Sequence, residues 1–426
     1  MPFFYSISIR LFALAIGIAA LFHRKARLWK KGRKKWRKNL KQNIPSNRQI
    51  IWFHCASLGE FEQGRPIMEA IQKETPDIFL LITFFSPSGY EIRKNTPIAG
   101  HVCYLPLDTK KNAFDFINIV RPETAFFVKY EFWFHYLNAL QQAEIPTYFI
   151  SSSFRPNQYF FKSTGRWTHP YLRKITRFFV QNQQSKTLLE NIGVTHITVS
   201  GDTRFDRTAK LAENPQTLPL IKKFKGSNRL LIGGSTWQPE ESLLFALSKE
   251  NISDLKIIIA PHDVSESRFQ AIEKLFEGNC LRFSRANSEN VDKADVLIID
   301  SIGLLNKIYY HADIAFVGGA FGSGLHNILE ALTYGVPVFF GPKTKKFPEA
   351  QQAITAGCGL QISDEITFVR EIKALLDSPE NLQSCRQKSR NFIRNNAGAT
   401  EIIMQEWNLF KAKDHINKNP FFPEDS

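Results

Sequence analysis

Short apolar runs alternate with helical patterns along most of the chain. The first run is Gln49–Cys55, a helical pattern follows from about Gln63 to Glu74, and Ile78–Phe85 is the second run. These runs are apolar almost throughout, which is typical of parallel strands that helices cover on both faces. The alternation therefore predicts a doubly wound α/β sheet. Further strands of this series are predicted at Val102–Leu105, Thr124–Val128, Pro146–Ile150, Arg177–Val180 and Ile197–Ser200.

The pattern breaks at Gly201–Thr217, which we interpret as a polar link, and a second series of strands follows. Helices at about Pro379–Asn395 and Thr400–Lys411 end this series, and we expect them to pack back across the first domain. The tail from Asp414 onward is polar and is expected to be frayed. The strands of the second series are predicted at Leu230–Gly233, Leu255–Ala260, Asp295–Ile299, Asp313–Val317 and Pro337–Phe340.

The length of the chain and the two series give the expected domains. A chain of 426 residues is too long for one core and favours two domains of about 150–200 residues each. Two facing Rossmann-like domains would form a central cleft at the carboxyl ends of their strands, where ligands bind. We expect an anchor and basic collar at 1–41, a first Rossmann-like domain at 42–205, a second Rossmann-like domain with terminal helices that pack back at 206–411 and a tail at 412–426.

The positive charge of the chain is concentrated in one short segment near the N-terminus. This basic collar, His23–Lys41, holds 11 Lys and Arg residues in 19 positions and no acidic residue. The collar and Arg10 account for twelve of the net charge of +15, which leaves +3 for the rest of the chain. The body of the protein is therefore close to neutral.

An apolar segment, Phe3–Phe22, precedes the collar and has Arg10 as its only charge. Its length would just span a bilayer core of about 30 Å. Because the positive charge follows the apolar run, a cleaved signal peptide is disfavoured, and the body is expected on the cytoplasmic side of the membrane. The collar would contact anionic headgroups, and Trp29 and Trp36 suit an interfacial position.

Two alternatives to a spanning anchor stay open. A basic arm could bind nucleic acid, but such an arm does not explain the apolar run before it, so no nucleic-acid partner is expected. A helix that lies in the membrane interface would accommodate Arg10 better than a full span. The five cysteines are widely spaced without metal-ligand patterns, which fits core residues in a reduced cytoplasmic compartment.

The most distinctive local pattern is a glycine-rich stretch, Val317–Pro342. A predicted strand ends at Val317, glycines including Gly319 and Gly324 follow, and a helix is predicted from near His326 to Gly335. Glycines allow close approach of the backbone to a ligand, and the N–H groups of a helix start bind anions. The dinucleotide and P-loop spacings are absent. The stretch therefore indicates a nucleotide site, with a tight packing turn as the alternative.

Two polar residues follow the loop on one face of the predicted helix. Asn327 and Glu330 are three residues apart, so they would lie on the same side. An Asn at a helix start can contact a phosphate or ribose, and a carboxylate one turn later can accept both ribose hydroxyls.

Two carboxylates follow strands of the first series. Glu60 closes Ser57-Leu58-Gly59-Glu60 after the first strand, near a helix N-terminus that would keep it ionised, so it is a candidate general base. Glu131, in Lys129-Tyr130-Glu131-Phe132-Trp133, is a second candidate that would bind acceptor hydroxyls or hold a basic side chain. A helix cap and a surface helix start are the structural alternatives. Ser57 is a candidate for binding acceptor or phosphate.

Further candidates follow strands of the second series or join the two domains. In Gly234-Ser235-Thr236 the backbone and the hydroxyls of Ser235 and Thr236 suit a phosphate, and a plain turn with an N-cap is the alternative. His262, after Pro261, is placed to face the base or phosphate. Arg204 at the domain link and Lys345 and Lys346 after Gly341-Pro342 are candidates for binding phosphate or carboxylate.

No Asp-x-Asp pair follows any strand, and there is no His/Cys cluster. A metal that bridges donor phosphates is therefore not indicated, and no cofactor is expected. In a metal-free site, helix dipoles and basic side chains would have to stabilise the leaving phosphate.

Several of these motifs together resemble a known family. Leu58-Gly59-Glu60, Glu131-Phe132-Trp133, Gly234-Ser235-Thr236 and Phe340-Gly341-Pro342, and above all the run Gly324-Leu325-His326-Asn327-Ile328-Leu329-Glu330, look like the 3-deoxy-D-manno-octulosonic acid (Kdo) transferases of lipopolysaccharide synthesis. The likeness extends from the apolar anchor to about Lys411. The chain differs from the family at Lys129, where a glutamate is usual, at Pro261-His262, where Pro-Arg-His is usual, and at Ser151–Ser153, where Asn-Ala-Arg is common.

The resemblance implies a GT-B glycosyltransferase fold with an N-terminal membrane-anchor helix. It implies inverting, metal-independent transfer of Kdo from CMP-Kdo to a lipid A precursor (lipid IVA) at the cytoplasmic face of the inner membrane. Carried onto matching positions, Glu60 is the general base and Glu131 a second essential carboxylate. The positions implied around the nucleotide are Ser235, Thr236, Asn327 and Glu330.

Rival functions stay open from the residues alone. Another GT-B glycosyltransferase or a UDP-sugar epimerase would use a different donor, and a non-catalytic membrane-bound nucleotide sensor would bind a nucleotide without transferring a sugar. The sensor gives no reason for two carboxylates in the cleft.

Overall fold

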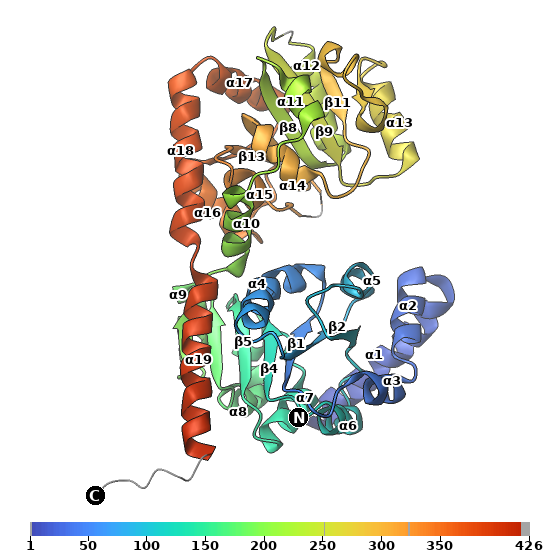
Figure 1. Ribbon diagram of the computed structural model, residues 1–426, viewed down its shortest axis with the longest axis vertical. Coiled ribbons are helices and arrows are strands. Elements are labelled where there is room, and N and C mark those ends of the chain that lie inside the picture. The colour runs from blue at the N-terminus through green and yellow to red at the C-terminus, as the bar shows by residue number, and fades with distance from the viewer. Residues whose placement is uncertain (1, 251, 323, 419–426) are drawn as a thin grey trace, which may run out of the picture. The chain divides into compact units, whose positions relative to one another are not determined.

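The computed structural model describes residues 2–250, 252–322 and 324–418 (Figure 1). Within them the chain divides into two compact units. Unit 1 holds Met1–Asp206 and Gly398–Ser426, and unit 2 holds Arg207–Ala397. Each unit is built on a seven-stranded parallel sheet. The prediction of two doubly wound α/β domains is therefore confirmed.

The sheet of unit 1 has the strand order β3-β2-β1-β4-β5-β6-β7. The order reverses beside β1, so β1 and β4 are neighbours although two strands separate them in the chain. Every residue of β1, β2, β4 and β5 is buried, which explains their continuous apolar sequences. The strands are β1 (Ile50–Cys55), β2 (Phe79–Phe84), β3 (His101–Tyr104), β4 (Thr124–Val128), β5 (Thr147–Ser152), β6 (Arg177–Val180) and β7 (Ile197–Val199).

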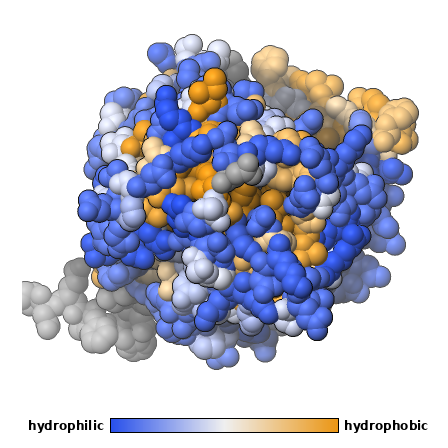
Figure 2. Space-filling view, turned by 90° about the horizontal axis from the view of Figure 1, so that it is seen from above, coloured by the Kyte–Doolittle hydropathy of each residue, from blue (hydrophilic) through white to orange (hydrophobic). Residues whose placement is uncertain are grey.

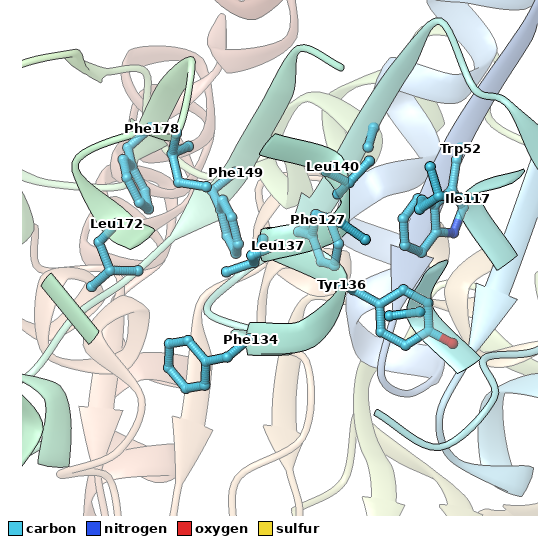
Figure 3. Packing of buried hydrophobic residues seen from close by; sticks show 14 of the residues in the cluster. Trp52, Ile117, Phe127, Phe134, Tyr136, Leu137, Leu140, Phe149, Leu172 and Phe178 are labelled. Carbon is cyan, nitrogen blue, oxygen red and sulfur yellow. The ribbon is translucent and has the colours of Figure 1, made fainter. Parts of the chain in front are cut away.

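Helices cover both faces of this sheet. On one face, α6 (Lys110–Val120) and α7 (Phe134–Gln142) pack over a core rich in aromatic side chains (Figure 3). On the other face, α4 (Leu58–Glu74) packs with the C-terminal helix α19 (Ala399–Lys418), whose Trp407 contacts Phe126 of β4. Smaller helices of the unit are α5 (Pro87–Arg93), α8 (His169–Leu172) and α9 (Gln183–Glu190).

Three helices at the N-terminus precede the first strand. They are α1 (Pro2–Phe22), α2 (Arg24–Gly32) and α3 (Trp36–Asn43). Phe3–Phe22 is the one described helix that is long and apolar enough to cross a membrane. Its exposed apolar side chains include Phe3, Leu21 and Phe22. In Figure 2 hydrophobic residues gather at the upper right, on the side where Figure 1 places α1 and α2.

One side of these N-terminal helices packs on unit 1. The Tyr5 hydroxyl donates to Asp108 Oδ2 at 2.5 Å, and Ser6 Oγ lies 2.9 Å from His135 Nε2. The two tryptophans expected at a membrane interface are instead packed in the unit. Trp29 is buried and contacts Phe85, and Trp36 is half-buried against Phe116.

The sheet of unit 2 has the order β10-β11-β9-β8-β12-β13-β14, and it reverses beside β8, so β8 and β12 are neighbours. Its strands are β8 (Arg229–Thr236), β9 (Leu255–Pro261), β10 (Leu281–Arg282), β11 (Val296–Ile298), β12 (Ile314–Val317), β13 (Val338–Phe340) and β14 (Gly359–Gln361). Its helices are α11 (Pro219–Lys225), α12 (Gln238–Ser248), α13 (Glu266–Leu275), α14 (Leu305–Ile308), α15 (Leu329–Leu332), α16 (Pro348–Thr355), α17 (Glu365–Leu376) and α18 (Pro379–Asn396).

Three details of the sequence prediction are wrong. Most of the polar link is a helix, α10 (Thr203–Glu213). The helix expected from His326 to Gly335 is a single turn, α15. The chain remains helical past Asp414 to Lys418, and the last part of the predicted tail, residues 419–426, lies outside the described residues. The short strands β10 and β14 were not predicted.

Candidate functional site

Each unit places its candidate residues at the point where its strand order reverses. In a doubly wound sheet, ligands bind at the carboxyl ends of the strands at this position. In unit 1, Glu60 follows β1 and Glu131 follows β4. In unit 2, Ser235 lies at the end of β8 and Gly319 follows β12. The structure thus brings together residues that lie about 70 positions apart or more in the chain.

Glu60 lies in the first turn of α4, and two groups hold its carboxylate. The Ser57 hydroxyl donates to Glu60 Oε2, and Lys129 Nζ lies 3.3 Å from Glu60 Oε1. Burial raises the pKa of Glu60, but Lys129 and Ser57 outweigh burial, so the pKa lies below its ordinary value. Glu60 is therefore ionised at neutral pH. Its first-turn position agrees with the helix-cap alternative as well as with the proposed role.

Glu131 lies in the tight turn between β4 and α7 and has a different electrostatic environment. Burial, together with the negative charge of Glu60, raises the pKa of Glu131 to about 7. The carboxyl group is therefore partly protonated at neutral pH. Two neighbouring carboxyl groups whose pKa values are pushed apart are typical of sites where acid and base roles are divided.

The residue between these carboxylates has a strained backbone. Lys129 has a φ of +65°, as does Ser151 at the end of β5 with +50°. A side chain in this region costs of order 1–3 kcal/mol and is frequent at functional sites. The Ser152 hydroxyl donates to the Lys129 carbonyl at 2.5 Å and helps to hold the turn. Lys129, for which sequence analysis gave no role, is therefore the cation of this site.

A buried polar network lies beneath the Glu131 turn. The Trp133 indole donates to His54 Nε2 at 3.0 Å, and His54 Nδ1 lies 2.9 Å from Thr83 Oγ1. Burial and the charge of Arg33 lower the pKa of His54 to about 3. The imidazole is therefore neutral and accepts a hydrogen bond from the indole N–H. This bond fixes the side chain of Trp133, which follows Glu131 by two residues.

In unit 2 the glycine-rich loop folds back on itself. The His326 N–H donates to the Gly318 carbonyl at 3.1 Å, and the Gly324 N–H donates to the Gly319 carbonyl at 3.1 Å. Gly319 has a φ of +95°, and a Cβ there would lie 2.2 Å from the Gly324 carbonyl oxygen. The packing of the loop therefore requires a glycine at position 319, which agrees with the structural alternative of a tight packing turn.

The backbone N–H of Gly319 already has a partner. It donates to Oε1 of the buried Glu240 at 2.7 Å, and Oε2 of the same carboxylate accepts from the Trp237 N–H at 3.1 Å. Glu240, the third residue of α12, therefore fixes the start of the loop. Sequence analysis missed this residue, because only the fold brings it next to Gly319.

The polar residues after the loop surround the short helix α15. Asn327 Oδ1 accepts from the Leu329 N–H at 3.2 Å, and Asn327 Nδ2 donates to Glu330 Oε1 at 3.1 Å. Asn327 and Glu330 therefore lie side by side, as predicted from their spacing. Because α15 has only four residues, its dipole cannot stabilise a leaving phosphate as a longer helix would. This corrects the expectation that a helix at His326 would do so.

The two hydroxyl side chains at the end of β8 differ in how accessible they are to a ligand. Thr236 is fully buried, and its hydroxyl donates to Glu241 Oε1 at 3.0 Å. Glu241 in turn is paired with Arg268. Ser235 is half-buried and has a φ of +52°. Ser235 is therefore the better candidate for contact with a ligand, and Thr236 supports the turn.

Three rings form a stack beside this turn. His262 lies between Trp237, at a centroid distance of 4.8 Å, and His326, at 4.3 Å. The Trp237 indole also donates to His326 Nε2 at 3.3 Å. Burial and the charge of His262 lower the pKa of His326 to about 4. The imidazole of His326 is therefore uncharged, and the stack offers flat ring surfaces of the kind that bind nucleotide bases. Trp237 was not predicted.

The remaining candidate residues for binding phosphate or carboxylate are less well placed to contact a ligand. Arg204 forms an ion pair with Asp202 at 2.7 Å, so its charge is already balanced within unit 1. Lys345 and Lys346 are exposed in a turn before α16. Lys343 instead reaches the glycine-rich loop, where its Nζ donates to the Phe321 carbonyl at 2.8 Å. Among the described residues, no group of three or more His, Cys, Asp or Glu side chains could hold a metal ion.

Comparison with known proteins gives a consistent result. Residues 27–207 match the family model for 3-deoxy-D-manno-octulosonic-acid transferase (kdotransferase). A transferase of that name from Chlamydophila psittaci is 27% identical over 382 residues, which cover 87% of each chain. One from Aquifex aeolicus is 26% identical over 82% of this chain and 92% of the relative. The sequence thus resembles the Kdo transferases over most of its length, and this similarity identifies the chain as a glycosyltransferase.

The fold of the chain agrees with known structures. UDP-GlcNAc 2-epimerase from Neisseria meningitidis, solved with UDP-GlcNAc, superposes with a TM-score of 0.60 at 15% identity, over 84% of this chain and 99% of the epimerase. At this identity the likeness concerns the fold alone, which is GT-B.

Proposed function

We propose that the protein transfers Kdo from CMP-Kdo to a lipid A precursor in lipopolysaccharide synthesis. Similarity to the Kdo transferases supports Kdo as the sugar. The observation that carries the proposal is the pair of carboxyl groups at the β1/β4 switch point, one held ionised by Lys129 and the other with a raised pKa.

Unit 1 acts as the acceptor half in this proposal. Glu60 takes the proton of an acceptor hydroxyl as that oxygen attacks the anomeric carbon of Kdo, which inverts the configuration there. The ion pair with Lys129 keeps Glu60 free of a proton before the reaction. Glu131, partly protonated at neutral pH, donates a hydrogen bond to an acceptor oxygen and so orients it. General-base assistance of this kind contributes about 10²–10⁴-fold to the rate.

Unit 2 acts as the donor half. The ring stack of Trp237, His262 and His326 supports the base or sugar of the nucleotide. Glu330 accepts hydrogen bonds from the ribose hydroxyls, the adjacent Asn327 contacts the ribose or a phosphate, and Ser235 contacts a phosphate oxygen. CMP leaves without a metal ion in this scheme, and Lys343 beside the glycine-rich loop supplies positive charge.

The N-terminal helices place the enzyme at its lipid substrate. The apolar α1 and the exposed lysines and arginines of the collar favour attachment to the cytoplasmic face of the inner membrane. The decisive experiment incubates the purified full chain with a lipid A precursor and CMP-Kdo and measures the mass of the lipid. A mass increase by Kdo supports the proposal. No increase with CMP-Kdo, but turnover of a UDP-sugar, would replace it with the epimerase or another glycosyltransferase.

The role of Glu60 is tested by Glu60→Gln. We expect kcat to fall by about 10²–10⁴-fold, with unchanged binding of CMP measured by calorimetry, because the nucleotide residues lie in unit 2. Glu69→Gln is the matched control, since Glu69 lies on the same helix and pairs with Arg65 at 2.6 Å, where both side chains are partly exposed. Near-full activity of Glu60→Gln would remove Glu60 as the base.

A further inference from the structure

A hollow of about 600 Å³ lies between the anchor helix α1 and the first turns of α6. Ser6 and Arg10 line it from α1, and Lys110, Lys111 and Asp115 line it from α6. None of these side chains belongs to the candidate sites at the two switch points. The hollow therefore needs an explanation of its own.

The hollow carries more positive charge than its one carboxylate can balance. Asp115 is paired with Lys111 at 3.1 Å and with Arg37 at 2.6 Å. No ion pair joins Arg10 or Lys110 to any residue that the structure describes. Two cations thus remain at one hollow without a counter-ion, which is an arrangement that favours an anionic ligand.

The packing of α1 fixes this charge next to an apolar surface. The hydrogen bonds from Tyr5 to Asp108 and between Ser6 and His135 hold the first turns of α1 on unit 1. Further along α1, Leu11 and Leu14 are exposed. If this apolar surface enters a membrane, Arg10 enters with it, and an uncompensated arginine within a bilayer costs about 2.5–3.5 kcal/mol or more. A lipid headgroup is the anion available at that depth.

We propose that this hollow binds the phosphate monoester of a membrane lipid, with Arg10 and Lys110 as its two cationic contacts. The site itself rests on the hollow and its charges, whereas identification of the lipid with the sugar acceptor rests on the proposed function. A phosphate monoester carries a charge of about −1.5 to −2 at neutral pH, which matches two free cations. The diester of an ordinary phospholipid carries about half that charge and would leave one cation unbalanced.

Vesicle binding of the full chain tests the site. Phosphatidylcholine vesicles carry either phosphatidic acid, a monoester, or phosphatidylglycerol, a diester, at contents matched for surface potential. The wild type should bind the monoester vesicles more tightly. In the double variant Arg10→Gln with Lys110→Gln the preference should disappear, because each lost contact costs about 1 kcal/mol, or about fivefold.

Two control variants separate this site from general attraction to anionic membranes. Lys25→Gln with Lys30→Gln removes two exposed collar charges and should weaken binding to both vesicle types equally, which leaves the preference intact. Arg10→Lys with Lys110→Arg keeps both charges and should keep the preference. A wild type without preference, or a double Gln variant that retains it, would overturn the site.

An activity measurement separates the site from the proposed function. With a lipid A precursor as acceptor, we expect the double Gln variant to raise the KM for the lipid about 25-fold, as two contacts of about fivefold each imply, while the KM for CMP-Kdo stays unchanged. A monoester preference without any Kdo transfer by the wild type would refute the function and leave the site. Transfer by the wild type without a monoester preference would refute the site and leave the function.

Discussion

At the scale of single residues, Lys129 carries most of the new information about the site. The family usually has a glutamate here, and this chain has a lysine whose Nζ lies 3.3 Å from Glu60. The positions of Glu60 and Glu131 just after parallel strands were predictable because each follows an apolar run. The ion pair was not predictable, because Lys129 and Glu60 are far apart in sequence and only the pairing of β1 with β4 brings them together.

Substitution of Lys129 by Met should shift the pH dependence of the reaction. Without the lysine, burial dominates and raises the pKa of Glu60, so less of the base is ionised at a given pH. The acidic limb of kcat/KM should move to higher pH by about one unit. Lys129→Arg retains the charge and should leave the limb near its wild-type position. An unchanged profile in Lys129→Met would show that this ion pair does not control the base.

At the scale of elements, the long buried strands were predictable and the short or exposed elements were not. The apolar runs predicted β1, β2, β4 and β8 because those strands are covered on both faces. Helix α10 was missed because its sequence is mostly polar, and tertiary contacts support it: the Thr203 hydroxyl donates to the Gln63 carbonyl at 2.5 Å, and the Asp206 carboxylate accepts from the Thr400 N–H at 2.6 Å.

The segment after the glycine-rich loop shows why helix periodicity alone was misleading there. Its sequence has the spacing of an amphipathic helix, but the His326 N–H donates back to the Gly318 carbonyl. Side-chain bonds of Asn327 then replace a regular first turn. That Asn327 and Glu330 lie side by side was therefore predictable, whereas their local backbone was set by the loop.

The loop can be tested by adding one methyl group. Gly319→Ala places a Cβ 2.2 Å from the Gly324 carbonyl oxygen in a backbone with a φ of +95°, so we expect loss of CMP binding and a loss of stability of about 1–3 kcal/mol. Gly322→Ala is the control, because its Cβ would meet its nearest neighbour at 3.8 Å. Calorimetry with CMP and thermal melting measure both effects. Equal behaviour of the two variants would show that the loop shape is not required for the nucleotide.

At the scale of the whole molecule, the net charge does not distinguish two kinds of basic side chain in the collar, those exposed to solvent and those packed against unit 1. Nine of its eleven basic side chains are exposed, whereas Arg33 and Arg37 point into unit 1. The Arg33 guanidinium lies 3.8 Å from the Trp29 ring centroid and donates to the carbonyls of Phe85 and Leu105, each at 2.8 Å. Arg37 bonds Asp115. Composition showed where the charge lies in the chain but not which charges face solvent.

This division predicts two distinct phenotypes within one short segment. Replacement of Lys30, Lys31 and Lys34 by Gln should weaken binding to anionic vesicles by about fivefold per residue, with an effect that decreases at high salt, and should leave the melting temperature unchanged. Arg33→Gln should lower the melting temperature instead, because buried carbonyl oxygens lose their donor at a cost of about 1–3 kcal/mol. Arg33→Gln removes one charge, so it should weaken vesicle binding no more than a single lysine substitution does.

Because Phe85 stacks on Trp133 at 4.7 Å, we also expect Arg33→Gln to reduce kcat more than the triple lysine variant does in detergent, where no membrane is present. Equal loss of vesicle binding and equal melting temperatures would show that the collar acts as one uniform basic surface.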